Sequence, residues 1–367
     1  MKLRTRLVVL GVVAIGLAYG SYNFKEDRLF MQTTIAHSAK GDVQKTLELM
    51  EQTSFLANPL INIYYQVKKR QFQARFVDRD EQFDDISSSV AINQIANTYR
   101  QYWTAKLLRI PEATDEQLFE DLAVIMERPP LADGAAPRDP DVVFGALLDL
   151  IEAEGLYAAS FYLNGMFGLK IWEEQSSEMH QISLPNETID VEVVRIENYL
   201  LRGMHSYFTL NAYADGGWVA TNQKVYCNVD EYDFDSEKFL VSFLKHEGQH
   251  YADLKKFPNL TGADLEYRSK LVELMYCTDA TRDALLKKFV LNASGKDRAF
   301  SHAYANRNLI QNLSQILFDE PYVEDLDSWD SISFERLNAA AKALFEENCA
   351  QLEQDPLVSE LIMTGLS

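Results

Sequence analysis

The chain is poor in basic residues for its length of 367 residues. It has 35 lysines and arginines against 55 aspartates and glutamates, which gives a formal net charge of −20. A protein that binds nucleic acid needs a basic face to contact phosphates, so this balance excludes DNA and RNA from the expected partners. We interpret the acidity as a feature that favours solubility.

Cysteine is also scarce, with Cys227, Cys277 and Cys349 as the only examples. Their spacing excludes a cysteine-based zinc motif. In an oxidising compartment one pair would form a disulfide and leave one thiol over, and Cys227 with Cys277 is the preferred pair. Three buried free thiols are an equal alternative.

No repeat of fixed period and no collagen-like, coiled-coil or low-complexity bias is present. Hydrophobic residues make up 47% and charged residues 25% of the chain, as is usual for globular proteins. The length indicates two domains, each able to bury a core.

The first 24 residues have the pattern of a targeting segment. Lys2, Arg4 and Arg6 precede an uncharged run over residues 7–24, and Ala18-Tyr19-Gly20 fits the small-x-small rule for cleavage. We expect a cleaved signal peptide or, equally, an uncleaved membrane anchor formed by residues 7–24. Either fate places the rest of the chain outside the cytoplasm, in the periplasm or anchored in the inner membrane and facing it.

Residues 25–165 are predicted to form a helical domain. Apolar residues recur at a spacing of three to four in the segments 42–50, 58–72, 91–108, 115–126 and 141–159. Thr114 is the expected N-cap of the fourth segment. A loop rich in proline and glycine over residues 128–140 precedes the last one.

Residues 166–367 are predicted to form a second domain with a small sheet followed by helices. Strands are expected at 169–172 and 189–196, and a hairpin is expected to join 207–214 to 218–229 around Asp215-Gly216-Gly217. Asp235 or Ser236 would cap the next helix, and another helix is expected over 263–277. The predicted fold class of the whole chain is therefore α+β, with helices predominating.

The stretch His246-Glu247-Gly248-Gln249-His250 carries the clearest chemistry in the chain. It has the form H-E-x-x-H. In a helix the two histidines lie one turn apart, so both imidazoles can bind one zinc ion. Glu247 would then lie beside the metal, where a carboxylate can take a proton from a zinc-bound water.

A hydrolytic zinc site needs a third protein ligand and one open position. Glu266, sixteen residues after His250, is our first candidate for that ligand, and Glu273 on the same helix face is the reserve. Ser269 is small and would let the two helices approach. Asp253, seven residues after His246, is a candidate to accept the outer N–H of a ligand histidine or of a neighbour.

The segments HEGQH and LEYRS resemble the gluzincin class of zinc metallopeptidases, in which a glutamate on a downstream helix completes the motif. The resemblance covers about residues 205–280. It implies a zincin-like peptidase domain, His246, His250 and Glu266 as ligands, Glu247 as the catalytic base, and an edge strand within 218–226 that binds an extended peptide. It also implies a downstream donor for the oxyanion, for which His302 is the first candidate and Tyr304 the second.

These observations together predict an exported zinc-dependent peptidase that acts on a peptide or protein substrate. Two alternatives stay open. One is a non-catalytic protein that keeps zinc for structure or binding, and the other is an exported scaffold of the cell envelope in which the motif is accidental.

Overall fold

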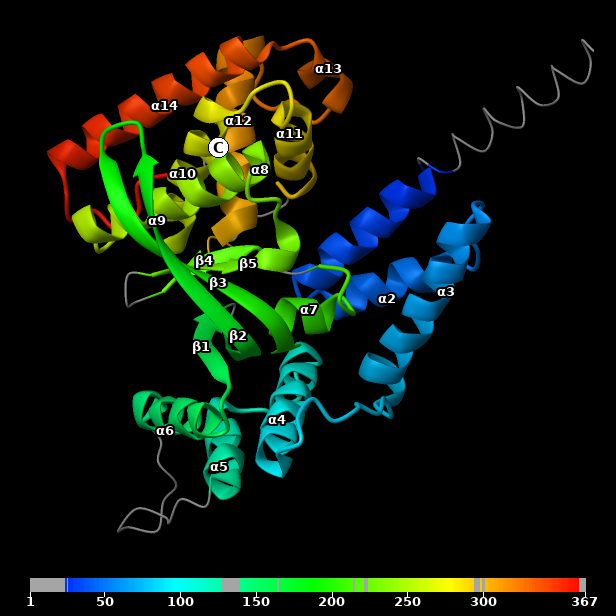
Figure 1. Cartoon of the computed structure of the whole chain (residues 1–367). Coiled ribbons are helices and arrows are strands. Elements are labelled where there is room, and N and C mark those ends of the chain that lie inside the picture. The colour runs from blue at the N-terminus through cyan, green and yellow to red at the C-terminus, as the bar shows by residue number, and fades with distance from the viewer. Residues whose placement is uncertain are drawn as a thin grey trace, which may run out of the picture. The chain divides into compact units, whose positions relative to one another are not determined.

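A computed structural model of the chain describes residues 24, 26–126, 139–163, 165–213, 215–220, 224–293, 298 and 301–362 (Figure 1). The predicted targeting segment, apart from Phe24, and most of the predicted loop at 128–140 lie outside these residues. The chain divides into two compact units. One comprises Met1–Glu173 and Tyr199–Ala214, and the other Glu174–Asn198 and Asp215–Ser367.

The first unit is mainly helical. Residues 26–39 form a helix. It is followed by α2 (Val43–Gln52), α3 (Pro59–Gln73) with a π-helical extension (Ala74–Asp78), α4 (Val90–Leu107), α5 (Asp115–Ile125), α6 (Pro140–Ala153), strand β1 (Tyr157–Leu163) and the short α7 (Met204–Phe208). The predicted cap of α5 is confirmed, because the Thr114 side chain accepts a hydrogen bond from the backbone N–H of Gln117.

Two sequence-based predictions in this unit are wrong. The helix expected over 141–159 ends at Ala153, because Gly155 takes a left-handed φ of 76° and the chain turns into β1. The segment 207–214, expected as the first strand of a hairpin, forms the end of α7 and a turn instead. Met204, Tyr207 and Phe208 are all buried, and their spacing fits one face of a helix rather than a strand.

The sheet is small and mixed. Its strand order is β1-β2-β3-β5-β4, with β2 at Met166–Ser183, β3 at Thr188–Leu201, β4 at Gly217–Val219 and β5 at Val225–Asn228. Strands β3 and β5 are parallel, whereas β4 pairs antiparallel with β5. The predicted strands at 169–172 and 189–196 lie within β2 and β3. The hairpin predicted between 207–214 and 218–229 is wrong, because the antiparallel pair β4 and β5 lies almost entirely within its second arm.

The helices of the second unit follow the sheet. They are α8 (Glu237–Phe239), a π-helical segment (Leu240–Lys245), α9 (His246–Lys256), α10 (Gly262–Tyr276), α11 (Arg282–Leu291), α12 (Ser301–Phe318), α13 (Leu326–Asp330) and α14 (Phe334–Gln354). Ser236 caps α8 by accepting a hydrogen bond from Phe239 N–H. The predicted class, α+β with helices predominating, is confirmed.

Helix α10 forms the centre of the second unit and packs against α9, α12 and α14 (Figure 1). Every residue from Ala263 to Leu274 except Leu265 is buried. Apolar residues such as Leu271 and Leu274 fill the core, yet several buried residues of this helix are ionisable. Buried charges require partners, so the neighbouring helices must supply them.

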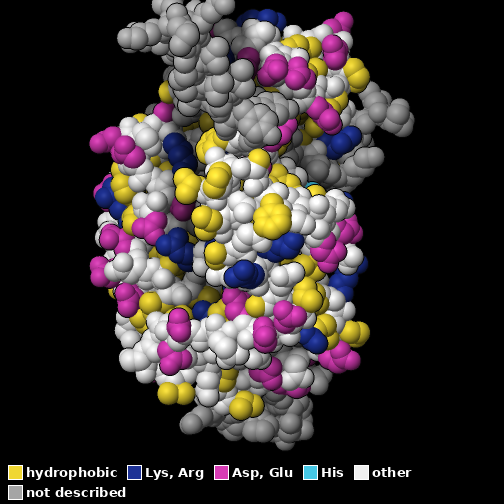
Figure 2. Space-filling view, turned by 90° about the vertical axis from the view of Figure 1, so that its right-hand side faces the viewer, with side chains coloured by type: hydrophobic (Ala, Val, Ile, Leu, Met, Phe, Trp, Pro, Cys, Tyr) yellow, Lys and Arg dark blue, Asp and Glu magenta, His cyan; other side chains and the backbone are white. Residues whose placement is uncertain are grey.

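All three cysteines are free thiols, and the preferred Cys227–Cys277 disulfide is not formed. Cys227 lies on β5 and Cys277 directly follows α10, and both are packed in the apolar core. On the face shown in Figure 2, acidic side chains are mixed with lysines and arginines. Within the described residues, no helix has the length and apolar character needed to cross a membrane.

Candidate metal centre

The two histidines of α9 converge on one point. His246 and His250 lie one turn apart, and their Nε2 atoms are 3.1 Å from each other. A π-helical segment leads directly into His246, a feature found often beside functional residues. Gly248 lies between them against the sheet, where a Cβ would come within 3.1 and 3.2 Å of Ile182. The absence of a side chain there lets α9 approach the strands closely.

Glu266 on α10 completes a three-residue group. Its Oε1 lies 3.3 Å from His250 Nε2, and its Oε2 lies 3.7 Å from His246 Nε2. One ligand atom from each of the three residues lies within 4.8 Å of the other two, and the group can hold a metal ion. Ligand atoms around a tetrahedral zinc, each about 2.0–2.1 Å from the ion, are about 3.3 Å apart. The three separations are therefore of the size that such an ion requires.

Each histidine is held from behind by a partner on α10. The Nδ1 of His246 lies 2.7 Å from Oε1 of the fully buried Glu273, and the Nδ1 of His250 lies 3.1 Å from Oγ of Ser269. A partner on Nδ1 fixes the ring orientation and leaves Nε2 facing the centre. Glu273, our reserve candidate for the third ligand, thus lies behind His246 rather than at the centre.

The electrostatics of the group favour a bound positive charge. Burial lowers the pKa of the His246 imidazole, but the carboxylates of Glu273 and Glu266 outweigh burial and raise it to about 9. Burial also opposes the ionisation of Glu266, whereas His302 and Lys270 beside it hold its pKa well below the usual range. Without a metal, a proton on the histidines balances the carboxylates, and a divalent cation would take its place.

Lys270 is a residue of the site that the sequence analysis missed. It is 2% exposed, and its Nζ donates a hydrogen bond to Oε2 of Glu266. A lysine four residues after a glutamate has the usual pattern of a pair on a helix surface. One signal in the sequence could have revealed it. Polar and apolar residues alternate around the whole circumference of α10, so the helix has no single polar face that solvent would cover.

His302 on α12 lies against the same carboxylate. Its Nδ1 is 2.8 Å from Oε2 of Glu266 and 3.3 Å from Nζ of Lys270, and 68% of its side chain is exposed. Tyr304 is two residues further along α12, where its hydroxyl donates to the carbonyl of Ile362 within the core. Of the two predicted oxyanion donors, His302 is the one whose ring contacts the group.

Glu247 is half-buried and close enough to Tyr232 and to Cys227 on β5 for its charge to act on both. Burial of the Tyr232 hydroxyl raises its pKa, and the negative charge of Glu247 raises it further. Among the described residues, no hydrogen bond or ion pair engages its carboxylate. Strand β4 is the last strand of the sheet and packs beside α9. The edge strand predicted over 218–226 is not one strand, because β4 at Gly217–Val219 forms the edge and β5 begins at Val225.

Asp253 does not contact a histidine. Its carboxylate accepts hydrogen bonds from Nε and Nη2 of Arg268 on α10, at 2.8 and 3.0 Å. Of the two partners predicted for Asp253, a ligand histidine or a neighbour, the donor is thus a neighbour, Arg268. Asp253 lies two turns beyond His246, level with Arg268, and serves to join α9 to α10.

Comparisons of this chain with protein-family models, with curated proteins and with solved structures find no match.

Proposed function

We propose that the chain is a zinc-dependent peptidase of the gluzincin type that hydrolyses peptide bonds. The observation that carries the proposal is the convergence of His246, His250 and Glu266 in one buried group, with the uncommitted carboxylate of Glu247 on the same helix. Two imidazoles and one carboxylate are a usual ligand set for catalytic zinc, and they leave a fourth position for water. A purely structural zinc site is closed by four protein ligands and needs no neighbouring base.

Bound zinc would lower the pKa of a water molecule and polarise the scissile carbonyl. In the proposed reaction, Glu247 accepts the proton of the attacking water and later donates it to the leaving amine. His302 is an exposed residue that contacts Glu266, and it would stabilise the negative charge that develops on the carbonyl oxygen. Glu273 and Ser269 keep the two ligand rings in place throughout.

The proposed substrate is a peptide or protein in the extracytoplasmic space, consistent with the targeting pattern of residues 1–24. Strand β4 ends the sheet, so its outer edge can pair with an extended peptide. Such pairing would align the peptide backbone with α9, against which β4 packs.

One observation bears on the metal affinity of the group in both the catalytic and the non-catalytic proposal. The buried Lys270 ammonium already contacts Glu266, which reduces the negative charge that this carboxylate offers to a metal. A protein that keeps this group for structure or for binding a partner would share the same three ligands. The two proposals differ only in whether Glu247 acts on water.

Replacement of Glu247 by glutamine distinguishes the catalytic from the non-catalytic proposal. The wild-type protein loaded with zinc should cleave peptides of a broad library. Glu247→Gln should bind zinc equally well but cleave at least about a hundredfold more slowly, because general-base catalysis contributes that much or more to the rate. The exposed Glu346→Gln, on α14, is the matched control and should cleave normally. Zinc binding without cleavage by the wild-type protein would instead support the non-catalytic alternative.

A further inference from the structure

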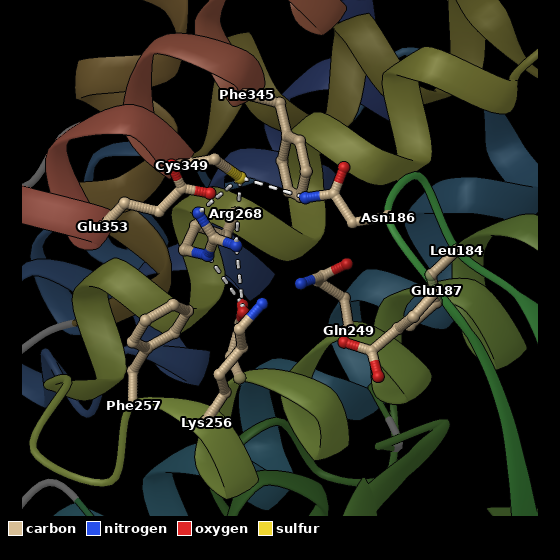
Figure 3. A pocket seen from close by; sticks show the side chains of 11 residues that line it. Leu184, Asn186, Glu187, Gln249, Lys256, Phe257, Arg268, Phe345, Cys349 and Glu353 are labelled. Atoms are coloured by element: carbon tan, nitrogen blue, oxygen red, sulfur yellow. Dashed lines mark hydrogen bonds and ion pairs between the residues drawn. The ribbon is translucent and has the colours of Figure 1, made fainter. Parts of the chain in front are cut away.

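A cavity lies further along α9, towards its C-terminal end, and is separate from the metal centre. Its volume is about 30 Å³. Four elements of the second unit surround it: Gln249 belongs to α9, Arg268 to α10, Cys349 to α14, and Asn186 to the turn between β2 and β3 (Figure 3). A cavity of about 10–15 Å³ holds one water molecule. The cavity therefore accommodates a polar molecule with about two heavy atoms.

The sulfur of Cys349 forms one wall of this cavity and is surrounded by N–H donors. Asn186 Nδ2 lies 3.3 Å from Sγ, and the two terminal nitrogens of Arg268 lie 3.6 and 3.7 Å from it. Arg268 is itself 2% exposed and is held in place by Asp253 and Asn348. These N–H groups are placed to stabilise negative charge that develops on the sulfur when it acts as a nucleophile.

Gln249 provides an independent indication that the cavity takes a polar occupant. This residue is 4% exposed, and no hydrogen bond engages its amide among the described residues. Figure 3 shows the amide directed into the middle of the cavity, between Arg268 and the turn that carries Asn186. A buried amide is normally hydrogen-bonded. An occupant with both donor and acceptor atoms would satisfy it.

We propose that Cys349 is a peroxide-reactive thiol and that the cavity beside it admits hydrogen peroxide. Two oxygen atoms fit the volume, and both can exchange hydrogen bonds with the Gln249 amide. The Cys349 thiolate attacks one peroxide oxygen, so that an S–O bond forms while the O–O bond breaks. The sulfur loses two electrons and becomes a sulfenic acid, and the second oxygen leaves as hydroxide and takes a proton from solvent.

The charges at the rim of the cavity do not oppose this chemistry. The carboxylates of Glu187 and Glu353 belong to exposed residues, and the exposed Lys256 lies at the same rim. Water screens these side chains, whereas Arg268 is buried beside the sulfur. The Arg268 guanidinium is paired with Asp253, and its terminal nitrogens still contact the sulfur.

The other two cysteines are internal controls for the test. Cys227 and Cys277 are 0% and 1% exposed, and burial raises their pKa values to about 12 and about 11. The full-length protein is treated with hydrogen peroxide in the presence of dimedone, and the labelled peptides are quantified by mass spectrometry. Cys349 should be labelled at least about tenfold faster than either control, because thiolate character and access decide oxidation.

Two substitutions at Asn186 test the role of the surrounding donors. This residue is exposed on a turn, so neither change should affect folding. Asn186→Asp places a negative charge near the sulfur and should slow labelling of Cys349 about fivefold or more, whereas Asn186→Ala removes one donor and should slow it less. The bulkier tert-butyl hydroperoxide should react with Cys349 more slowly than hydrogen peroxide. Labelling of Cys349 no faster than that of the buried cysteines, or unchanged in Asn186→Asp, would overturn the proposal.

Discussion

At the scale of single residues, the candidate metal centre is organised by the partners of its ligands. His246 has Glu273 behind it and Glu266 in front, at 2.7 and 3.7 Å. Glu266 in turn contacts Lys270 and His302. The two carboxylates make the centre a place where a positive charge is stable, and either a proton or a metal ion can supply that charge. Proton and metal must therefore compete for the histidines.

This competition predicts a pH dependence of zinc binding. Because the pKa of His246 is raised to about 9, zinc must displace a proton at neutral pH, and its affinity should rise between pH 6.5 and 8.5. Calorimetry in two buffers that differ in ionisation enthalpy should show about one proton released per zinc at pH 7. Glu273→Gln removes a carboxylate that raises this pKa and should reduce the proton release near pH 8.

The same shift has a consequence for the metal-free fold. A raised pKa means that the protonated His246 stabilises the folded state below its ordinary pKa of 6.5, and that this contribution is lost as the pH rises through about 9. The metal-free protein should thus be less stable at pH 9 than at pH 6.5, and zinc should reverse the difference. Zinc binding without any release of protons from pH 6.5 to 8.5 would contradict the account.

At the scale of elements, the centre depends on how α9 and α10 are joined. Asp253 and Arg268 form a bidentate ion pair between these helices, and both residues are 2% exposed. His250 precedes Asp253 by three residues and Glu266 precedes Arg268 by two, so the pair lies next to the ligands along both helices. We infer that it fixes the distance and rotation between the two ligand-bearing helices.

Removal of one member of this pair should lower the stability of the fold much more than removal of both. Arg268→Met leaves the Asp253 charge buried without its partner and should lower the free energy of unfolding by about 3–5 kcal/mol. The double variant Asp253→Leu/Arg268→Met should recover most of that loss, because no buried charge is left over. Chemical denaturation of the metal-free proteins measures the free energy of unfolding of the single and the double variant.

The exposed pair Lys342–Glu346 on α14 provides the matched control, since its members are 62% and 64% exposed. Lys342→Met should hardly change stability, because an exposed ion pair contributes little. Equal stability of Arg268→Met and the wild type would show that the buried pair does not join the helices as inferred.

At the scale of the whole molecule, local patterns predicted most of the elements and the three converging ligands. Helices such as α4 and α5 and the strands β2 and β3 have clear apolar periodicity, and the spacing of His246 and His250 determines their common face. The segment around Met204–Phe208 was misread, because its apolar residues fit either a helix or a strand in so short a stretch. The division into domains at residue 165 stays a prediction.

The remaining errors concern partners that are distant in the chain. Lys270 was missed, since nothing local reveals that α10 is enclosed by α9, α12 and α14. For Asp253 the sequence left a ligand histidine and a neighbour open as partners, and the partner is Arg268 on the next helix. Cys227 and Cys277 flank the motif in sequence, yet that proximity says nothing of their distance in the fold. Pairing of this kind depends on tertiary packing, which the sequence pattern does not record.

The convergence of His246, His250 and Glu266 is tested most directly by the metal content of the purified protein. After equilibration with zinc and removal of excess ion, the wild-type protein should retain one zinc per chain, and His246→Ala, His250→Ala and Glu266→Ala should each lose most of it. The exposed Glu346→Gln should retain zinc like the wild type. A wild-type protein that retains no more zinc than the His246→Ala variant would contradict the account.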